Sequence, residues 1–150
     1  MPALTADSPL GPISIVDEDG AITALDWGGA ATDHTRLLDE AHRQLAAYFD
    51  GNLTRFDLPL APKVSPTLQH FLDALLAIPF GETKTYGEIA KETQLSPQAA
   101  GQACGANPIA IIIPCHRVIG TGNLGGFSAR GGIETKVALL KHEGAASLLI

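Results

Sequence analysis

Cysteine and long apolar runs are scarce in this chain, and each scarcity excludes a class of protein. Only two of the 150 residues are cysteine. Two cysteines are too few for the disulfide framework that stabilises small secreted domains. No apolar run approaches the roughly 20 residues that a membrane-spanning helix needs. The N-terminus lacks the basic start and apolar core of a signal peptide, so we expect a cytoplasmic protein with reduced thiols.

Positive charge is scarce too. The chain has 10 Lys and Arg against 16 Asp and Glu, a net charge of −6 that argues at first against a nucleic-acid partner. Residues 1–63 hold four basic and ten acidic residues, whereas residues 64–150 hold six of each. The acidity therefore lies wholly in the first part, and the second part is free to approach a polyanion. Because that part is neutral rather than basic, we expect weak DNA binding with few phosphate contacts.

At 150 residues the chain is long enough for one ordinary domain or two small ones, and its apolar content of 45% is enough for a core. Short alternating segments predict strands over Ile13–Val16 and Ile22–Trp27, joined by a tight turn. Apolar residues at helical spacing predict a helix from Leu37 to Phe49. The proline-containing segment that follows has no helical period and is interpreted as a linker.

Three segments of the second part begin with helix-start signals. Ser65 and Ser96 are each followed by proline, the pattern of an N-cap with proline at the first helical position. Thr85 and Glu88 have the spacing of a capping box. The third helix must end near Asn107, which precedes a proline. The second and third helices are short and separated by the segment TQLS, which predicts a helix-turn-helix.

The last of these helices is almost without bulky side chains. Its small residues are Ala99, Ala100, Gly101, Ala103, Gly105 and Ala106. Glycine costs a helix about 1 kcal/mol relative to alanine, so two glycines need a reason. Either the helix packs closely against another element, or it lies deep in a nucleic-acid groove where large side chains would clash. Spacing alone leaves both explanations open.

The segment NPIAIIIPCHRVIG runs apolar residues, which should be buried, into a proline and then a thiol, an imidazole and a guanidinium. A thiol reacts as its thiolate, and a neighbouring imidazole can take its proton. Adjacent side chains on a strand point to opposite faces, so Cys115 and His116 can meet only where the backbone turns, as Pro114 would allow. A third group should orient the histidine. Glu143, on a predicted closing helix that Gly144 would end, is the candidate.

Plainer interpretations compete with a reactive cysteine. The pair could be a packed thiol beside a surface imidazole, whereas zinc is disfavoured because the cysteines lack partners at ligand spacing. The segment GTGNLGGFSARGG lacks the ending of a phosphate-binding loop. Because it closely follows Cys115 and glycine lets backbone approach a ligand, we interpret it as a loop lining a site. The residues alone thus favour a cysteine nucleophile of unknown substrate.

In order along the chain, TYGEIA, NPIAIIIPCHRVIG, LGGFSARGGIETK and KHEG resemble the signature of the O6-alkylguanine-DNA alkyltransferases, or methylated-DNA–protein-cysteine methyltransferases. The resemblance is close over residues 65–150. It implies an α+β fold: a small N-terminal domain of sheet plus helix with a ribonuclease H-like layout over residues 1–62, linker included. A helical, winged helix-turn-helix domain would form residues 63–150.

The resemblance implies direct DNA repair in a single turnover. Such a protein, expected here as a monomer without cofactor or metal, binds double-stranded DNA in the minor groove and flips the damaged base. It moves the alkyl group from O6-alkylguanine, with O4-alkylthymine as a further candidate, to its own cysteine. Lesion-binding relatives that recruit other repair factors are the alternative, but they lack the active cysteine. An unrelated cysteine transferase or hydrolase fits the ordered motifs poorly.

Roles follow from the resemblance by motif position. Cys115 is the acceptor, His116 the base that acts through water, and Glu143 orients the imidazole. Asn107 ties the recognition helix to the strand carrying the nucleophile. The expected DNA contacts are Tyr86, Gln98, Ala99, Gly101, Gln102 and Arg117, although Arg117 has an internal hydrogen-bonding role as its alternative. The expected pocket residues are Cys104, Pro114, Val118, Gly126, Phe127, Ser128 and Lys136.

Three of these positions need comment. Gln98 stands where the family normally has an arginine that fills the space of the flipped base, and glutamine lacks its charge and five-donor fork. We therefore expect weaker DNA binding and a shallower salt dependence. Phe127 stands where many relatives have tyrosine, which removes a hydroxyl from the pocket wall. Cys104 is interpreted as a buried structural thiol, with reaction at this sulfur as the alternative.

Overall fold

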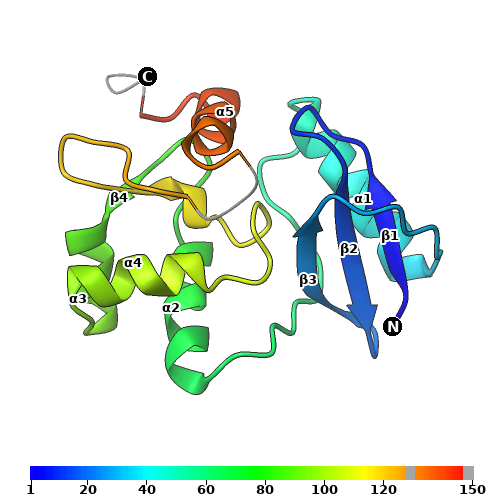
Figure 1. Cartoon of the computed structure of the whole chain (residues 1–150), viewed down its shortest axis with the longest axis horizontal. Helices are drawn as coiled ribbons and strands as arrows, with labels where there is room; N and C mark the ends of the chain where they lie inside the picture. Colours follow the sequence, from blue (N-terminus) through cyan, green and yellow to red (C-terminus); the bar gives the residue numbers. More distant parts are fainter. Residues whose placement is uncertain (128–130, 147–150) are drawn as a thin grey trace. The chain divides into compact units, whose positions relative to one another are not determined.

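The computed structural model describes residues 1–127 and 131–146, and the chain divides into two compact units, Met1–Lys63 and Val64–Ile150 (Figure 1). Each unit has buried apolar residues of its own. None of the helices in these described ranges is both long and apolar enough to cross a membrane.

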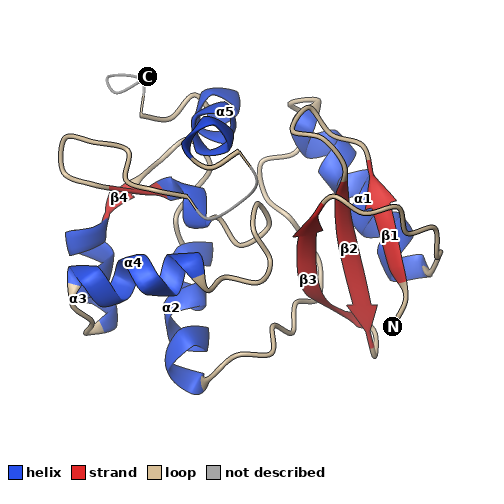
Figure 2. Cartoon of the chain, in the orientation of Figure 1, coloured by secondary structure: helices blue, strands red, loops and turns tan. Residues whose placement is uncertain are grey.

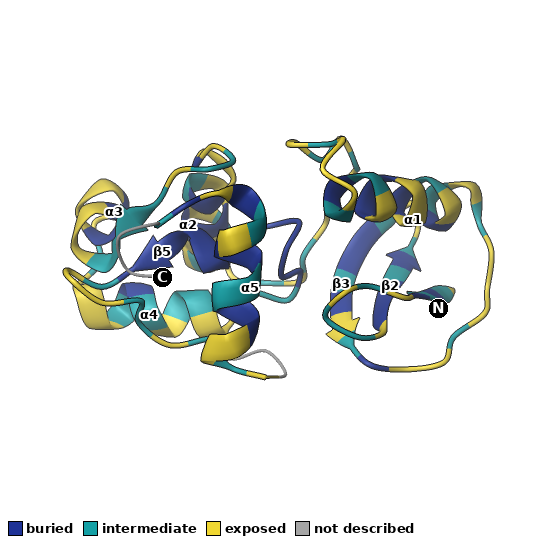
Figure 3. Ribbon diagram, turned by 90° about the horizontal axis from the view of Figure 1, so that it is seen from above, coloured by how far each residue is buried: buried dark blue, intermediate teal, exposed yellow. Residues whose placement is uncertain are grey.

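The N-terminal unit is a three-stranded antiparallel sheet with one helix (Figure 2). Its elements, with strand order β1-β2-β3, are β1 (Ala3–Ala6), β2 (Ile13–Glu18), β3 (Ala21–Trp27) and α1 (Arg36–Phe49). The sheet buries Ile13, Ile15 and Ile22, and α1, which lies along the sheet (Figure 3), buries Leu38 and Leu45. The predicted strands and helix are confirmed. Strand β1 was not predicted, because two of its four residues are alanine, which is uncommon in strands.

The C-terminal unit is mainly helical. Its elements are α2 (Pro66–Leu76), β4 (Lys84–Thr85), α3 (Tyr86–Thr93), α4 (Pro97–Gly105), the one-turn 3₁₀ helix η1 (Cys115–Arg117), β5 (Val118–Ile119) and α5 (Ile133–Glu143). Strands β4 and β5 pair in parallel. Helices α3 and α4 are joined by a short turn and pack together, which is the predicted helix-turn-helix arrangement. Phe71, Leu72, Ile89 and Ala100 form part of the core beneath it.

The helix boundaries follow from local capping chemistry. The hydroxyls of Ser65 and Ser96 accept backbone N–H groups at the starts of α2 and α4. Thr85 and Glu88 form a reciprocal capping box, with bonds of 3.1 and 2.9 Å. Gly144, in the left-handed region at φ 67°, ends α5. All four signals were predicted from sequence, because each depends on residues within one turn of the helix end.

The apolar segment before Cys115 is buried as predicted, with residues 109–113 at most 8% exposed. It is not a strand, however. The Ile112 N–H donates to the Ala110 carbonyl (2.9 Å) around Ile111, whose φ is +72°. That is a γ-turn, and a positive φ is strained for a β-branched residue. The strand expected to carry the nucleophile is therefore wrong, because the backbone reverses here instead of extending.

Candidate active site

Cys115 is placed by a second tight turn and by the Asn107 side chain. The Cys115 N–H donates to the Ile113 carbonyl (2.8 Å), and Pro114 between them has φ −82° and ψ 66°, again a γ-turn. Asn107 Nδ2 donates to the same carbonyl (2.8 Å), and its Oδ1 accepts the Ile109 N–H (3.0 Å). One carbonyl oxygen thus joins the end of α4 to the cysteine backbone. Asn107 holds two successive turns rather than a strand.

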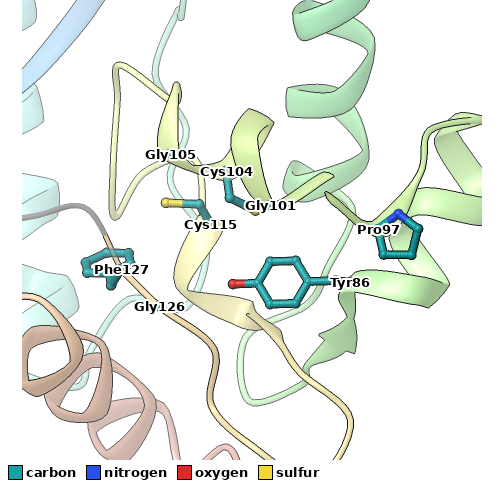
Figure 4. A pocket seen from close by; sticks show the side chains of 8 residues that line it. All are labelled: Tyr86, Pro97, Gly101, Cys104, Gly105, Cys115, Gly126 and Phe127. Carbon is teal, nitrogen blue, oxygen red and sulfur yellow. The ribbon is translucent and has the colours of Figure 1, made fainter. Parts of the chain in front are cut away.

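Cys115 faces a pocket in the C-terminal unit. Cys115 begins η1 and is 6% exposed. The pocket has a volume of about 580 Å³, within the range of sites for small molecules. It is lined by Tyr86, Pro97, Gly101, Cys104, Gly105, Cys115, Gly126 and Phe127 (Figure 4). Two of these, Pro97 and Gly105, were missed from sequence, because which face of α4 lines the pocket depends on the fold.

The environment of Cys115 keeps its thiol protonated. Burial raises the pKa of the Cys115 thiol, while the hydrogen bond with Asn107 and the charge of Lys136 act in the opposite direction. The second thiol in the pocket is also protonated at neutral pH, because burial and then the nearby Cys115 raise the pKa of Cys104 to about 12. A base is therefore needed before either sulfur can attack.

His116 is held by a buried carboxylate. Its Nε2 lies 2.8 Å from Glu143 Oε2, and neither side chain is exposed. Its Nδ1 is buried without a hydrogen-bond partner in the described part of the chain. Burial lowers the pKa of the His116 imidazole, and the bond to Glu143 only partly offsets this. A neutral imidazole with Nε2–H donating to Glu143 leaves Nδ1 as an acceptor, which is what a base requires.

Arg117 lies inside the protein, so its expected DNA contact is corrected to an internal role. Its Nε and Nη2 donate to the two Glu143 oxygens at 2.8 and 3.0 Å, and its Nη1 donates to the Ile78 carbonyl at 2.6 Å. The guanidinium also lies 5.9 Å from the Phe80 ring centroid. These hydrogen bonds from the charged guanidinium fix the position of the Glu143 carboxylate. Arg117 thereby supports the orientation of His116.

Lys136 connects three parts of the pocket. Its fully buried side chain donates from Nζ to the carbonyls of Val118 (2.6 Å) and Gly126 (3.2 Å) and to the Tyr86 hydroxyl (3.5 Å). The ammonium lies 5.6 Å from the centroid of the Tyr86 ring. Burial lowers the pKa of Lys136 to about 8, an effect opposed by Cys104 and Cys115. Lys136 was predicted only as a support, and the structure shows what it holds.

The outward side of α4 is slim without any packing need for it. A Cβ atom on Gly105 would meet nothing within 4 Å, and one on Gly101 would lie 3.9 Å from the Tyr86 ring, an ordinary contact. Close packing among the described residues therefore does not require either glycine. Gln98 and Gln102 are exposed on this helix, and Ala99 is half-buried. Ser128 lies outside the described residues.

Comparison with known proteins identifies both units. Residues 66–145 match the DNA-binding domain of the 6-O-methylguanine DNA methyltransferases, and residues 3–62 match their ribonuclease-like domain. The chain is 42% identical to a methylated-DNA–protein-cysteine methyltransferase of Methanosarcina acetivorans, covering 93% of this chain and 96% of the relative. It is also 42% identical to the enzyme of that name from Mycobacterium tuberculosis, covering 93% and 90%.

Solved structures agree. The crystal structure of Mycobacterium tuberculosis OGT in complex with DNA superposes with a TM-score of 0.87 at 41% identity, covering 99% of this chain and 98% of that one. An O6-methylguanine DNA methyltransferase from Methanococcus jannaschii has a TM-score of 0.65 at 25% identity, covering 94% and 93%.

Proposed function

The chain belongs to the 6-O-methylguanine DNA methyltransferase family, and from this premise we propose that Cys115 accepts the alkyl group. The protein repairs DNA by transferring an alkyl group irreversibly from O6-alkylguanine to one of its own cysteines, so each molecule acts once. One observation carries the assignment to Cys115. Of the two cysteines in the pocket, it is the one that adjoins His116, which is buried on Glu143.

In the proposed reaction, Cys115 Sγ attacks the alkyl carbon attached to O6 of guanine. The S–C bond forms as the C–O6 bond breaks, and its electron pair leaves with the base. His116 takes the thiol proton at Nδ1 through a water molecule, and Glu143 stabilises the resulting imidazolium. Support comes from the His116 Nδ1 atom, which is buried and has no partner among the described residues.

The leaving guanine needs a proton, and Tyr86 is the proposed donor; the Tyr86 phenolate regains a proton from the Lys136 ammonium, whose Nζ lies 3.5 Å from the hydroxyl oxygen. The Tyr86 side chain lines the pocket from the first turn of α3. Burial raises the pKa of Tyr86 to about 12, with smaller contributions from Cys104 and Cys115, so the hydroxyl stays protonated at neutral pH. Its polar contact with Lys136 aligns the hydroxyl at the pocket wall.

The protein binds DNA. We propose that α4 enters the minor groove and that the target base is flipped into the pocket. The small residues of α4 support this, since among the described residues a Cβ on Gly105 would meet nothing within 4 Å and one on Gly101 would make only an ordinary contact. Gln98 in the first turn of α4 would occupy the space of the flipped base, and Gly101 and Gln102 would lie along the groove. The monomeric state, the cytoplasmic location and activity on O4-alkylthymine stay predictions.

Mass spectrometry tests the assignment. The protein is incubated with a duplex oligonucleotide that contains O6-methylguanine, digested, and analysed for both cysteine-containing peptides. We expect one methyl group per molecule, on the peptide of Cys115. The variant Cys115→Ser should gain none, whereas Cys104→Ser should gain one like the natural protein. A methyl group on Cys104, or binding of the lesion without any gain in mass, would refute the proposal.

A further inference from the structure

The loop of residues 120–127, here called the wall loop, forms one side of the pocket. It follows β5, and its last two residues, Gly126 and Phe127, line the pocket (Figure 4). Loops hold their shape through local hydrogen bonds when they lack a regular ladder. The shape of this wall therefore depends on the bonds inside the loop, together with the packing of Leu124 against the core cluster of Ile119, Leu140 and Ala145.

One exposed side chain makes two of those bonds. Asn123 Oδ1 accepts the Gly125 N–H at 2.9 Å, and its Nδ2 donates to the Thr121 carbonyl at 3.3 Å. The amide packs directly over Gly120, where an added Cβ would lie 2.2 Å from Asn123 Oδ1. Real Cβ contacts are not that short, so any larger residue at 120 would displace the amide. Gly120 and Asn123 thus work as a pair.

The bond to Gly125 matters because Gly125 lies against Tyr86. A Cβ on Gly125, whose φ is +69°, would come within 2.7 Å of both the hydroxyl oxygen and Cε2 of Tyr86. The bare backbone of the loop therefore touches the hydroxyl end of the ring. Lys136 approaches the same hydroxyl and also binds the carbonyl of Gly126, the next residue of the loop. The Tyr86 hydroxyl is held between the wall loop and Lys136.

We propose that Asn123 is a positioning residue for the transfer reaction, which holds Gly125 against Tyr86 and so fixes the direction of the Tyr86 hydroxyl. The inference rests on the proposed function, because it needs Tyr86 to act on the leaving base. Asn123 itself touches neither the base nor the sulfur. Misplacement of a reacting group by about 1 Å can slow a reaction on the order of 100-fold, so a loosened loop has a measurable effect.

Single-turnover kinetics test this with matched variants. The methyl-transfer rate is measured at saturating O6-methylguanine duplex, so that changes in DNA affinity do not enter. Asn123→Ala removes the acceptor for Gly125 and should slow transfer by roughly 10- to 100-fold. Asn123→Asp keeps an acceptor oxygen and should restore the rate to within about 2-fold, since the Gly125 bond is retained. Gly120→Ala should reproduce Asn123→Ala.

A double-mutant cycle separates positioning from general damage. If Asn123 acts through Tyr86, then Asn123→Ala should slow the Tyr86→Ala variant by less than about 2-fold. Alkylation of Cys115 by iodoacetamide should match that of the natural protein, because it does not depend on the Tyr86 hydroxyl. Additive losses, a slower iodoacetamide reaction or an unchanged transfer rate in Asn123→Ala would each overturn the inference. Failure of the natural protein to methylate Cys115 would instead overturn the proposed function.

Discussion

His116 and Glu143 form a fully buried pair, with Nε2 of the imidazole 2.8 Å from Oε2 of the carboxylate. Arg117 binds both oxygens of the same carboxylate, which fixes its plane. Because the carboxylate accepts from Nε2–H, the other ring nitrogen of His116 is left to take a proton. His116 can therefore act as a base only through Nδ1.

Replacing His116 by glutamine should therefore slow methyl transfer. A positioned general base contributes about 10²- to 10⁴-fold, and His116→Gln removes it while keeping a polar side chain. Single-turnover assays with the O6-methylguanine duplex measure the rate. The control His70→Gln changes an exposed histidine of α2 and should react like the natural protein. A His116→Gln rate within a few-fold of normal would show that another group takes the thiol proton.

The same histidine should make the protein less stable in acid. Burial lowers the pKa of His116 below its ordinary value of 6.5. Below pH 6.5 the unfolded chain therefore binds a proton that the folded chain does not, so the free energy of unfolding falls as the pH falls. Urea unfolding between pH 7.5 and about 5 measures it. The difference in stability between the natural protein and His116→Gln should shrink towards low pH, and a constant difference would contradict the lowered pKa.

Removing the Arg117 guanidinium should strongly destabilise the C-terminal unit. Arg117→Met leaves the Glu143 carboxylate without its charged partner inside the protein, and breaking such a buried pair costs about 3–5 kcal/mol. Thermal and urea unfolding measure the loss. Arg43→Met, which breaks the exposed pair of Arg43 with Glu40, is the control and should change stability little. Equal effects of the two substitutions would mean that burial of the Arg117 pair is unimportant.

An arginine at position 98 should strengthen DNA binding. Gln98 is exposed in the first turn of α4, so Gln98→Arg adds a charge with no packing penalty. The logarithm of the binding constant should fall more steeply with the logarithm of salt concentration, by about 0.9 for one further phosphate contact. Fluorescence anisotropy at several salt concentrations measures this. Asn52→Arg adds the same charge in the N-terminal unit, and an identical gain from it would assign the effect to net charge alone.

Alkylation should lower the melting temperature. Cys115 is 6% exposed and is held directly after two tight turns, so its backbone cannot shift to let an added methyl group turn into the pocket without strain. Overpacking costs about 1–3 kcal/mol, and each kcal/mol shifts the melting temperature of a chain of this size by about 2–4 °C. Calorimetry before and after reaction measures the shift. Cys115→Ser treated with the same duplex should not move, and an unmoved reacted protein would show that the pocket accepts the methyl group freely.

The sequence was most informative where structure depends on near neighbours. The caps at Ser65, Thr85 and Ser96 each involve one helical turn, and all three helices begin where these residues predict. Burial of residues 109–113 followed from their apolar character alone. The path of that segment did not follow, because an apolar run fits a strand better than a turn with a positive φ at isoleucine.

The residues of the site could be predicted from the sequence better than the hydrogen bonds among them. Cys115, His116 and Glu143 could be named from their types and order. The hydrogen bonds from Arg117 to Glu143 join residues that are 26 apart in sequence, and no local sequence pattern predicts such a contact. Asn123 and Gly120 were noticed only as parts of a glycine-rich loop, since their importance lies in a close approach that depends on coordinates.

Ile111, in the segment before Cys115, is a difficult position at which to improve stability. At Ile111 the backbone favours glycine, since a left-handed residue with a side chain costs about 1–2 kcal/mol. Full burial favours isoleucine, whose sequestered side chain contributes about 1.5–3 kcal/mol, and Ile111 is 1% exposed. Because the two preferences are of similar size and opposite direction, neither residue is clearly superior. Mutant libraries that aim for a more stable protein should leave Ile111 unchanged and vary exposed residues instead.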